Sequence, residues 1–271
     1  MNKLKGLSVI LPTLNEEENL KELIPKIVEI LENIEITNYE LIVVDDSSED
    51  QTEELIKKMH NENRNIKFYA RKNERSLPIS ILDGINQSIY EHVMWLDADG
   101  SMNADSIKKL LEKLNENTEN VIIGSRFVEG GGYKGIEEVG TTSFFSAMYN
   151  VSKSNDSVLA TILSKIFNNI LFVLTPTNVK DLTSGFIVGK KEYFDSSVFL
   201  KSSYGDYFVY LVNSLHSKNI VIQEVGYLCE MRIHGESKTG SSIVQLIKRG
   251  LPYILAAVRC RMGNNENLLW K

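Results

Sequence analysis

The chain has 271 residues, which suits one large domain, alone or with an appendage, and its 42% hydrophobic and 24% charged residues are typical of a globular protein. Its formal net charge of −6 argues against a general nucleic-acid binder, which carries a basic surplus. The only cysteines, Cys229 and Cys260, are far apart in the sequence, so neither a disulfide framework nor a cysteine zinc site is indicated and a reducing cytoplasm fits. We expect no signal peptide, because the apolar part of MNKLKGLSVILPT is short, and no membrane-spanning helix, because no uninterrupted stretch approaches ~20 apolar residues.

Strand-like and helix-like patterns alternate through the first half of the chain. The apolar runs predict strands at 7–11, 41–44, 66–70, 93–96 and 121–123. The amphipathic runs predict helices at 16–31, 51–60, 79–89 and 104–114. This alternation favours a doubly wound α/β sheet flanked by helices, in which ligands bind at the carboxyl ends of the strands. A TIM barrel is less favoured, because the alternation stops near residue 126.

The pattern changes after residue 126. The Gly-rich run Glu129-Gly130-Gly131-Gly132-Tyr133 predicts a flexible joint of the kind that borders a site that opens and closes. Residues 143–174 look helical and unusually apolar, which fits either a buried core helix or a helix beside a lipid chain or a membrane interface. After Asp181 the pattern returns to strand, helix and strand, and a charged loop follows over 226–240.

The C-terminal segment 241–262 has an amphipathic helical pattern that Gly250 and Pro252 interrupt. Its apolar run, 251–258, is flanked on both sides by basic residues, which are Lys248, Arg249, Arg259 and Arg261. So short a run cannot cross a bilayer, but basic flanks around it suit an anionic lipid surface, and core packing is an equally good explanation. We therefore expect one domain over 1–240 and a helical tail over 241–271 that is a candidate for membrane association.

The most informative residues follow the predicted strand at 93–96. The run HVMWLDADG ends that strand in two carboxylates, Asp97 and Asp99, which project the same way because strand side chains alternate. Two hard oxygen ligands at the carboxyl edge of a sheet suit Mg²⁺ or Mn²⁺ held against a diphosphate. An acidic pair often just begins a loop, but a second acidic strand end, Asp45-Asp46, precedes this one. Together the two strand ends indicate a nucleotide-binding enzyme.

Polar residues also follow the first predicted strand. We expect Pro12, Thr13, Asn15 and Glu16 in the turn after it, where they either cap and complement the next helix or hold a nucleotide base and ribose. Asp46 suits ribose hydroxyls or base donors, because an ionised carboxylate only accepts hydrogen bonds. Its alternative role is to begin an Asp-Ser-Ser turn.

Six motifs taken in order resemble a known family. They are SVILPTLNEEENL, LIVVDDSSEDQT, MWLDADGS, VIIGSRF, DLTSGF and EMRIHGESKTG. Their order and spacing across residues 8–240 resemble the glycosyltransferase family 2 enzymes of dolichyl-phosphate mannosyltransferase type. The resemblance implies a GT-A fold, which is a Rossmann-like mixed sheet flanked by helices, together with a nucleotide-sugar donor and a Mg²⁺ or Mn²⁺ ion.

The resemblance also implies roles for individual residues. Those implied for nucleotide-sugar binding are Pro12, Thr13, Asn15, Glu16, Asp46, Asp97 and Asp99. Asp97 and Asp99 would flank the donor diphosphate as the metal site, with Asp99 as the direct ligand, and the metal would neutralise the departing nucleoside diphosphate. Arg126 would meet an anionic acceptor, while Arg232 and Lys238 would contact phosphates when their loop closes. The alternative for these three basic residues is a solvated surface position.

The leading hypothesis is a metal-dependent inverting glycosyltransferase that moves a hexose from GDP-mannose or UDP-glucose to polyprenyl phosphate. A lipid phosphate is already an anion, so positioning and charge stabilisation matter more than a general base. Asp206 raises the alternative of a sugar or glycolipid hydroxyl as acceptor in surface-glycan synthesis, with Asp206 as the base, unless it only caps the next helix. The expected catalytic residues are Asp99, Arg126, Asp206, Arg232 and Lys238.

Two further function classes are weighed against this hypothesis. A non-catalytic nucleotide-sugar sensor or membrane scaffold would bind the donor without turnover, and the complete DAD and RIHGESK motifs count against it. A dinucleotide-dependent oxidoreductase is disfavoured, because no G-x-G-x-x-G follows the first strand. We expect a cytoplasmic protein, with a peripheral position at the membrane face as the alternative that the two apolar segments raise.

Overall fold

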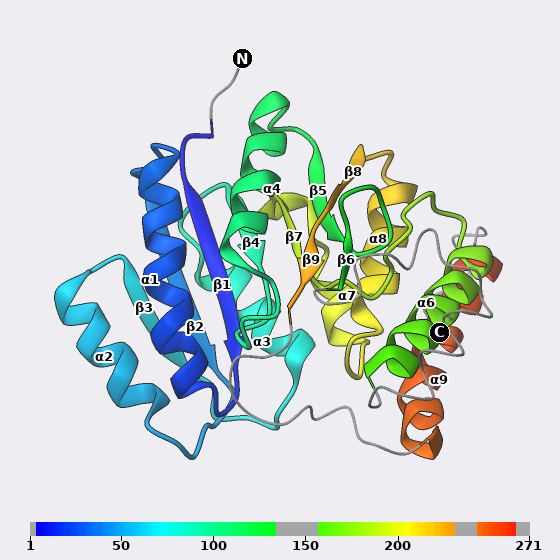
Figure 1. The fold of residues 1–271 in the computed structure, drawn as a ribbon, viewed down its shortest axis with the longest axis horizontal. Helices are drawn as coiled ribbons and strands as arrows, with labels where there is room; N and C mark the ends of the chain where they lie inside the picture. The colour runs from blue at the N-terminus through cyan, green and yellow to red at the C-terminus, as the bar shows by residue number, and fades with distance from the viewer. Residues whose placement is uncertain (1–3, 134–156, 231–242, 264–271) are drawn as a thin grey trace.

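The computed structural model describes residues 4–133, 157–230 and 243–263 (Figure 1). The large sheet is made of β1 (Leu7–Thr13), β2 (Tyr39–Asp45), β3 (Ile66–Ala70), β4 (His92–Trp95), β5 (Val121–Ser125), β7 (Ile187–Lys190) and β8 (Ile222–Gly226). Its seven strands are arranged in the order β3-β2-β1-β4-β7-β5-β8. A small second sheet pairs β6 (Gly132–Tyr133) with β9 (Leu228–Cys229).

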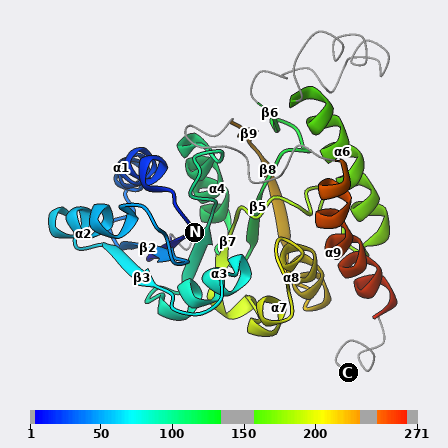
Figure 2. The same ribbon diagram turned by 90° about the horizontal axis from the view of Figure 1, so that it is seen from below.

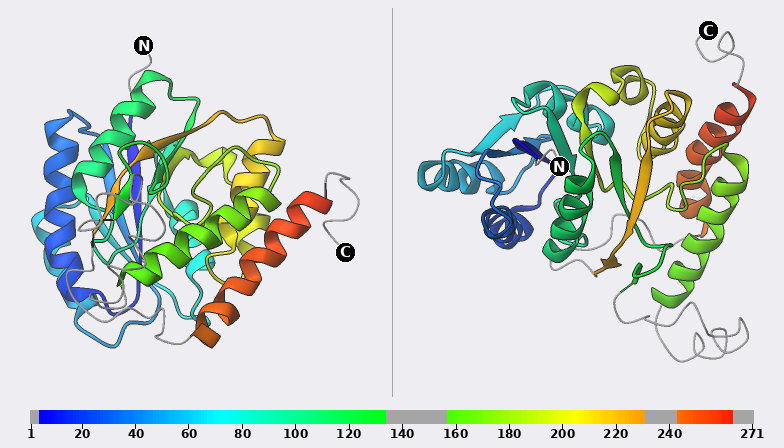
Figure 3. Two further views of the ribbon diagram at one scale, coloured as in Figure 1. Left: turned by 45° about the vertical axis from the view of Figure 1, so that its right-hand side comes forward. Right: turned by 90° about the horizontal axis from the view of Figure 1, so that it is seen from above.

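Helices cover both faces of the large sheet and one end of the molecule. They are α1 (Glu17–Asn33), α2 (Thr52–Glu62), α3 (Leu77–Gln87), α4 (Ala104–Glu116), α6 (Ser157–Leu174), α7 (Ser196–Leu200), α8 (Tyr207–Ser217) and α9 (Ile243–Met262), with a short 3-10 helix at Lys191–Tyr193. One face is covered by α1, α2 and α4, and the other by α3, α7 and α8. Helices α6 and α9 lie side by side at the end of the molecule opposite α2 (Figures 2 and 3). None of the described helices is both long and apolar enough to cross a lipid bilayer.

The strand directions place several chain segments at one edge of the sheet. β1 runs parallel to β2 and β4, and β2 runs parallel to β3. β7 is antiparallel to both of its neighbours, β4 and β5, so β4 and β5 point the same way. The carboxyl ends of β1, β2, β4 and β5 therefore meet at the edge where β7 begins. This is the edge at which ligands bind in open α/β sheets.

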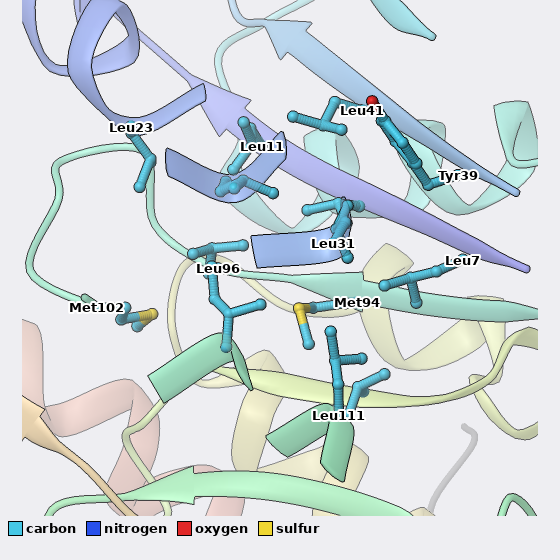
Figure 4. Packing of buried hydrophobic residues seen from close by; sticks show 14 of the residues in the cluster. Leu7, Leu11, Leu23, Leu31, Tyr39, Leu41, Met94, Leu96, Met102 and Leu111 are labelled. Atoms are coloured by element: carbon cyan, nitrogen blue, oxygen red, sulfur yellow. The ribbon is translucent and has the colours of Figure 1, made fainter. Parts of the chain in front are cut away.

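The central strands are almost wholly apolar because helices bury both of their faces. On β1, Val9 and Leu11 contribute to the core under α1, α2 and α4, whereas Ile10 contributes to the core under α3, α7 and α8. Figure 4 shows part of the first core, where Leu23 and Leu31 lie near side chains of the sheet. The two cores pack against opposite faces of the sheet. The polar edge described above is formed by the carboxyl ends of the same strands.

The predicted turn after the first strand begins later than expected. β1 includes Pro12 and Thr13, so the prediction that these two residues lie in the turn is wrong. Thr13 pairs in register with Asp45 of β2, and its Oγ1 donates a hydrogen bond to the carbonyl oxygen of Leu11 at 2.9 Å. The ladder with β2 therefore continues to the last residue of both strands.

The first turn of helix α1 donates a hydrogen bond to a side chain in the loop before α2. The alternative in which Asn15 or Thr13 caps this helix does not hold, because Glu16 is at the cap position, no side chain there caps the helix, and the N–H of Glu17 donates to Oδ2 of Asp50 at 3.1 Å. Oδ1 of Asp50 also accepts from the N–H and Oγ1 of Thr52, at 3.1 and 2.6 Å, at the start of α2. Burial alone would raise the pKa of Asp50, but these hydrogen bonds hold it below its ordinary value. The carboxylate of Asp50 thus accepts hydrogen bonds from the first turns of both α1 and α2, and it joins the loops that precede them.

Helix α9 is continuous through Gly250 and Pro252, contrary to the predicted interruption. A Cβ on Gly250 would lie 3.1 Å from Cε2 of Phe167, so glycine allows α9 to approach α6 closely. Pro252 removes one backbone donor from α9, which packs on both α6 and α8. The predicted division into 1–240 and 241–271 stays a prediction, and α9 contributes to the core under α8 through Ala256, Ala257 and Cys260. Part of the predicted helix at 143–174 is α6, and residues 143–156 lie outside the described residues.

Candidate active site

The two carboxylates of the DAD motif follow β4 directly at the polar edge. Asp99 is buried, and its Oδ1 accepts a hydrogen bond from the N–H of Ser101 at 2.9 Å. Gly100 has a φ of 75°, a left-handed conformation that turns the chain sharply after Asp99. On the other side, the N–H of Glu230, just after β9, donates to the carbonyl oxygen of Ser101 at 2.9 Å. The small sheet therefore braces the turn that carries Asp97 and Asp99.

The charges of Asp97 and Asp99 act on two neighbouring groups, Cys229 and Tyr207. Burial raises the pKa of the Cys229 thiol to about 11, and the nearby charges of Asp99 and Asp97 add to the rise. Burial also raises the pKa of the Tyr207 hydroxyl well above its ordinary value, with a contribution from Asp97. Both groups keep their protons at neutral pH. A partly buried pair of carboxylates beside a protonated thiol and a protonated hydroxyl suits a bound cation.

The residues at this turn fit a divalent metal ion that has other ligands as well. Asp97 and Asp99 supply the hard oxygen atoms that Mg²⁺ and Mn²⁺ prefer. Within the described ranges, no group of three or more His, Cys, Asp or Glu side chains is placed to hold an ion by itself. A cation here would therefore take its remaining ligands from a diphosphate or from water, as Mg²⁺ commonly does.

At the end of β2, the carboxylate of Asp46 is fully engaged by the protein. It accepts a hydrogen bond from Nη1 of Arg71 and another, at 2.7 Å, from the N–H of Ser76. Arg71 is itself buried, and its Nε donates to Oδ2 of Asp83 at 2.9 Å. Its remaining contacts are with Oγ of Ser80 and the carbonyl oxygens of Ser76 and Glu74. This cluster joins the end of β2 to the start of α3, and the predicted contact of Asp46 with a base or ribose stays a prediction.

The neighbouring residue Asp45, which was expected at the acidic strand end but not among the binding residues, has an unused acceptor. Its Oδ2 accepts from the N–H of Ser48 at 3.0 Å, but its Oδ1 is buried without a hydrogen-bond partner in the described part of the chain. Because a buried acceptor without a partner is unfavourable, such an atom is a natural place for a donor group of a ligand. Strand alternation could have indicated it, since Asp45 and Asp46 must face opposite sides of the sheet.

The other residues predicted for the nucleotide pocket lie beside this strand end. Asn15 has a φ of 54°, and its Oδ1 accepts from the N–H of Glu49 at 2.7 Å. The carboxylate of Glu16 accepts from Nδ2 of Asn19 at 2.6 Å. The structure thus brings Pro12, Thr13, Asn15 and Glu16 next to the loop after β2, and their contacts with a nucleotide sugar stay predictions.

Arg126, directly after β5, forms a forked ion pair with Asp181. Oδ2 of Asp181 accepts from the backbone N–H and from Nε of Arg126, at 2.9 and 2.8 Å. Oδ1 accepts from Nη2 at 2.8 Å, and Nη2 also donates to Oγ1 of Thr183 at 2.7 Å. Within the described residues, Nη1 makes no protein hydrogen bond. One edge of the guanidinium is therefore fixed by the protein while one nitrogen remains for a ligand.

The environment of Arg126 keeps it charged. Burial opposes the charge, but the carboxylate of Asp181 raises the pKa of Arg126 well above its ordinary value. The guanidinium carbon also lies 5.4 and 5.7 Å from the ring centres of Phe127 and Tyr133, at cation–π distance. Asp181 lies in the DLTSGF motif, but the sequence did not show which residue it pairs with. The predicted contact of Arg126 with an anionic acceptor stays a prediction.

The carboxylate of Asp206 is turned back on the loop before α8. Its Oδ1 accepts from the N–H and Oγ of Ser203, at 3.1 and 3.2 Å, and from the N–H of Tyr204 at 2.7 Å. It therefore organises the preceding turn and makes no side-chain cap on α8 itself. Its predicted role as a base stays a prediction. Arg232 and Lys238, the two remaining predicted site residues, lie outside the described residues.

Comparison with known proteins agrees with this arrangement. The family described as Glycosyl transferase family 2 matches residues 8–197. A dolichol-phosphate mannosyltransferase of Pyrococcus furiosus is 30% identical over 243 residues, which are 89% of this chain and 62% of that protein. The poly(ribitol-phosphate) beta-N-acetylglucosaminyltransferase TarP of Staphylococcus aureus is 30% identical over 226 residues, which are 80% of this chain and 65% of that protein. The chain thus spans less than two thirds of the length of these relatives.

Solved structures show the same fold. A glucosyl-3-phosphoglycerate synthase from Mycobacterium tuberculosis, in complex with Mn²⁺, UDP-glucose and phosphoglyceric acid, superimposes with a TM-score of 0.63 at 16% identity, covering 96% of this chain and 80% of that one. The likeness confirms the predicted GT-A fold, and the match across residues 8–197 confirms the resemblance that the motifs indicated. The chain belongs to glycosyl transferase family 2.

Proposed function

We propose that the protein is a metal-dependent inverting glycosyltransferase that moves a hexose from a nucleotide sugar, GDP-mannose or UDP-glucose, to polyprenyl phosphate. The observation that carries this proposal is the presence of two opposite charge centres at one sheet edge. Asp97 and Asp99 offer oxygen ligands for a cation, and Arg126 offers Nη1 to an anion. The name of the Pyrococcus furiosus relative supports a lipid phosphate as that anion.

The side chains present have distinct tasks in this reaction. A bound Mg²⁺ or Mn²⁺, held by Asp97 and Asp99, would neutralise charge on the donor diphosphate. Asp45 would accept a hydrogen bond from the base or ribose through Oδ1. Arg126, oriented by Asp181, would hold the acceptor phosphate so that one of its oxygens attacks the anomeric carbon. The bond to the nucleoside diphosphate breaks as the new bond forms, and no proton moves, so positioning and charge stabilisation carry the catalysis.

A second candidate is transfer to a hydroxyl group of a glycan or glycolipid. The name of TarP, a relative of equal identity, supports it. This reaction needs a base, and Asp206 is the predicted one. Three hydrogen bonds from Ser203 and Tyr204 already occupy Oδ1 of Asp206 and turn that oxygen toward the loop before α8. We therefore place the hydroxyl acceptor second.

The proposed partners follow from this chemistry. They are a nucleotide-sugar donor, a polyprenyl-phosphate acceptor and, for the second candidate, a glycan. We propose a cytoplasmic location with a peripheral position at the membrane face, because a polyprenyl chain is held in a bilayer. No nucleic-acid partner is proposed for a chain with a net charge of −6.

The test is sugar transfer by the purified protein with Mg²⁺ or Mn²⁺, a panel of nucleotide sugars, and polyprenyl phosphate present or absent. We expect a lipid-phosphate sugar product that requires the metal, and a drop of roughly 10²-fold or more in the rate for Asp99→Asn. Asp105→Asn is the matched control, because Asp105 is an exposed carboxylate in the first turn of α4. Metal-dependent hydrolysis of the donor without a lipid product would contradict the proposed acceptor.

Substitution of Asp206 separates the two candidates. Asp206→Asn keeps an oxygen that accepts from Ser203 and Tyr204, so the loop should persist. A phosphate acceptor should then react within about threefold of the wild-type rate, whereas a hydroxyl acceptor should lose roughly 10²-fold or more of the rate with its base.

A further inference from the structure

The segment between α6 and β7 carries Asp181, the partner of Arg126, and has no helix or strand of its own. Three successive N–H groups in this segment, those of Lys180, Asp181 and Leu182, donate to side chains of other elements. Asp181 and Leu182 are fully buried, where a backbone donor needs a partner. The side chains that supply these partners therefore decide where the Asp181 carboxylate lies.

Glu224, on β8 at the end of the large sheet, supplies two of these partners. Its Oε2 accepts from the N–H of Lys180 at 2.8 Å, and its Oε1 accepts from the N–H of Asp181 at 3.0 Å. In the ladder between β5 and β8, Glu224 lies opposite Ile123, which precedes Arg126 by three positions. Glu224 takes part in none of the ion pairs between described residues. Both of its carboxylate oxygens are thus committed to the backbone around Asp181.

Asn168, on α6, supplies the third partner. Its Oδ1 accepts from the N–H of Leu182 at 2.9 Å, and its Nδ2 donates to the carbonyl oxygen of Lys180. An amide offers both an acceptor and a donor, so this one side chain binds the residue before Asp181 and the residue after it. The Asn168 side chain is buried, which limits competition from water for these bonds. Glu224 and Asn168 together thus form a clamp on residues 180–182.

The clamp is connected to Arg126 through Asp181. Arg126 donates from its backbone N–H and from its guanidinium to both carboxylate oxygens of Asp181. Among the hydrogen bonds of the described residues, none joins Arg126 to Glu224 or to Asn168. Because a forked ion pair sets the plane of a guanidinium, a shift or rotation of Asp181 also changes the direction of Nη1. Nη1 is the nitrogen that remains for a ligand.

We propose that Glu224 and Asn168 are positioning residues for the sugar acceptor, on which they act by fixing the orientation of Arg126. The inference rests on the proposed function, in which Nη1 of Arg126 holds the acceptor phosphate. The elements that carry the clamp have other support, because β8 packs on β5 and α6 packs on α9. A misplacement of about 1 Å in an active site can cost about 10²-fold in rate, so a small movement of Arg126 is enough for a large effect.

The test compares two substitutions at Glu224 by steady-state kinetics with varied polyprenyl phosphate. Glu224→Gln keeps one acceptor oxygen and loses the other, whereas Glu224→Ala loses both. We expect kcat/KM for the acceptor to fall about tenfold and about 10²-fold respectively, while metal-dependent donor hydrolysis without acceptor stays within about threefold of the wild-type rate. Asn168→Asp, which loses the donor to Lys180, should also lower kcat/KM about tenfold. It repeats the test if thermal unfolding shows that Glu224→Ala is not folded.

A double-mutant cycle separates positioning from general support of the fold. The variant Arg126→Gln with Asp181→Asn lacks the ion pair that the clamp orients. Adding Glu224→Gln to that variant should leave its remaining kcat/KM for the acceptor unchanged within about threefold, because residues that act through one another are not additive. A further fall of about tenfold would show that Glu224 acts by another route, and it would overturn the proposal.

Glu40→Gln is the matched control. Glu40 also accepts from a backbone N–H, that of Ile89 at 2.8 Å, but it lies near the start of β2, at the opposite edge of the sheet. Its substitution should lower the midpoint of thermal unfolding and leave kcat/KM for the acceptor within about threefold of the wild type. Equal acceptor losses for Glu40→Gln and Glu224→Gln, or no loss for Glu224→Gln, would contradict the positioning role alone. A wild-type enzyme that hydrolyses the donor but transfers no sugar to polyprenyl phosphate would contradict the proposed function, and with it the inference.

Discussion

A buried arginine, Arg71, and a partly buried one, Arg126, lie at the same sheet edge and pair with carboxylates, but they use their nitrogens differently. Arg71 donates from Nε, Nη1 and Nη2 to groups of the protein, and its side chain is 2% exposed. Arg126 donates from Nε and Nη2 to Asp181 and Thr183, keeps Nη1 without a protein partner in the described residues, and is 13% exposed. Every nitrogen of the first guanidinium has a protein acceptor, whereas Nη1 of the second keeps both of its N–H groups for a ligand.

This difference teaches how to separate a structural ion pair from one prepared for a ligand. Both arginines carry a charge that burial opposes, and in both cases a carboxylate compensates it. Only Arg126 combines a carboxylate partner with a nitrogen, Nη1, that no described protein group uses, and its side chain is 13% exposed. The same logic applies to acceptors, because Asp46 is saturated by Arg71 and Ser76 while Asp45 retains a free Oδ1. Among the basic groups and among the acidic groups, one is thus occupied by the protein and one keeps an atom for a ligand.

The largest expected effect is on stability, at the saturated arginine. Arg71→Gln leaves Asp46 and Asp83 without their common cation, so the free energy of unfolding should fall by about 3–5 kcal/mol. Urea denaturation measures it. Arg75→Gln is the control, because Arg75 pairs with Glu49 at the surface and should cost at most about 1 kcal/mol. A loss at Arg71 no larger than at Arg75 would contradict its structural role.

The next effect is on catalysis, at the available arginine. The pair Arg126→Gln with Asp181→Asn removes both charges together, so no uncompensated charge stays buried. We expect kcat/KM for transfer to polyprenyl phosphate to fall roughly 10²-fold, about 2.7 kcal/mol, while donor hydrolysis changes by less than about threefold. Steady-state kinetics with varied acceptor checks this. An equal loss in both reactions would show that Arg126 acts on the donor instead.

Local patterns in the sequence predicted much of this architecture. The alternation of apolar and amphipathic runs predicted the succession of β1 to β5 and their helices along the chain. The apolar runs mark strands because a strand buried on both faces is a continuous apolar run. The predicted strand at 66–70 is β3, and the DAD carboxylates lie at the predicted strand end. Where local pattern alone was used, however, boundaries moved, as in β1, which extends through Pro12 and Thr13.

The rest depends on contacts between distant residues. Arg126 and Asp181 are 55 positions apart, and β7 must first insert antiparallel between β4 and β5 to bring them together. The cap that Asp50 gives to α1 likewise comes from a later loop. No periodicity in a single sequence encodes such partners. The sequence therefore pointed to which residue types matter, and the three-dimensional pairing showed which of them are free to bind.

A smaller effect is expected at the available carboxylate. Asp45→Asn removes the negative charge and can place an N–H₂ group where the ligand donor would lie. We expect KM for the nucleotide sugar to rise about tenfold, or roughly 1.4 kcal/mol, with the unfolding free energy within about 1 kcal/mol of the wild type. Asp83→Asn is a useful contrast, because Asp83 pairs with Arg71 and should alter stability more than KM. The reverse pattern would assign donor binding to the Arg71 cluster.

The smallest expected effect concerns the left-handed backbone conformation of two glycines near Arg126. Gly185, in the DLTSGF segment, has a φ of 69°, and Gly130 has a φ of 76°, so alanine at either should cost about 1 kcal/mol of stability. A Cβ at Gly185 would lie 3.4 Å from Oη of Tyr207, an ordinary contact, and one at Gly130 would meet nothing within 4 Å. Thermal unfolding should therefore show similar losses for the two variants. Only Gly185→Ala should also raise KM for the acceptor, because its strain is transmitted to the segment in which Asp181 holds Arg126. Equal acceptor KM values for both variants would mean that the position of Arg126 is fixed by its ion pair alone.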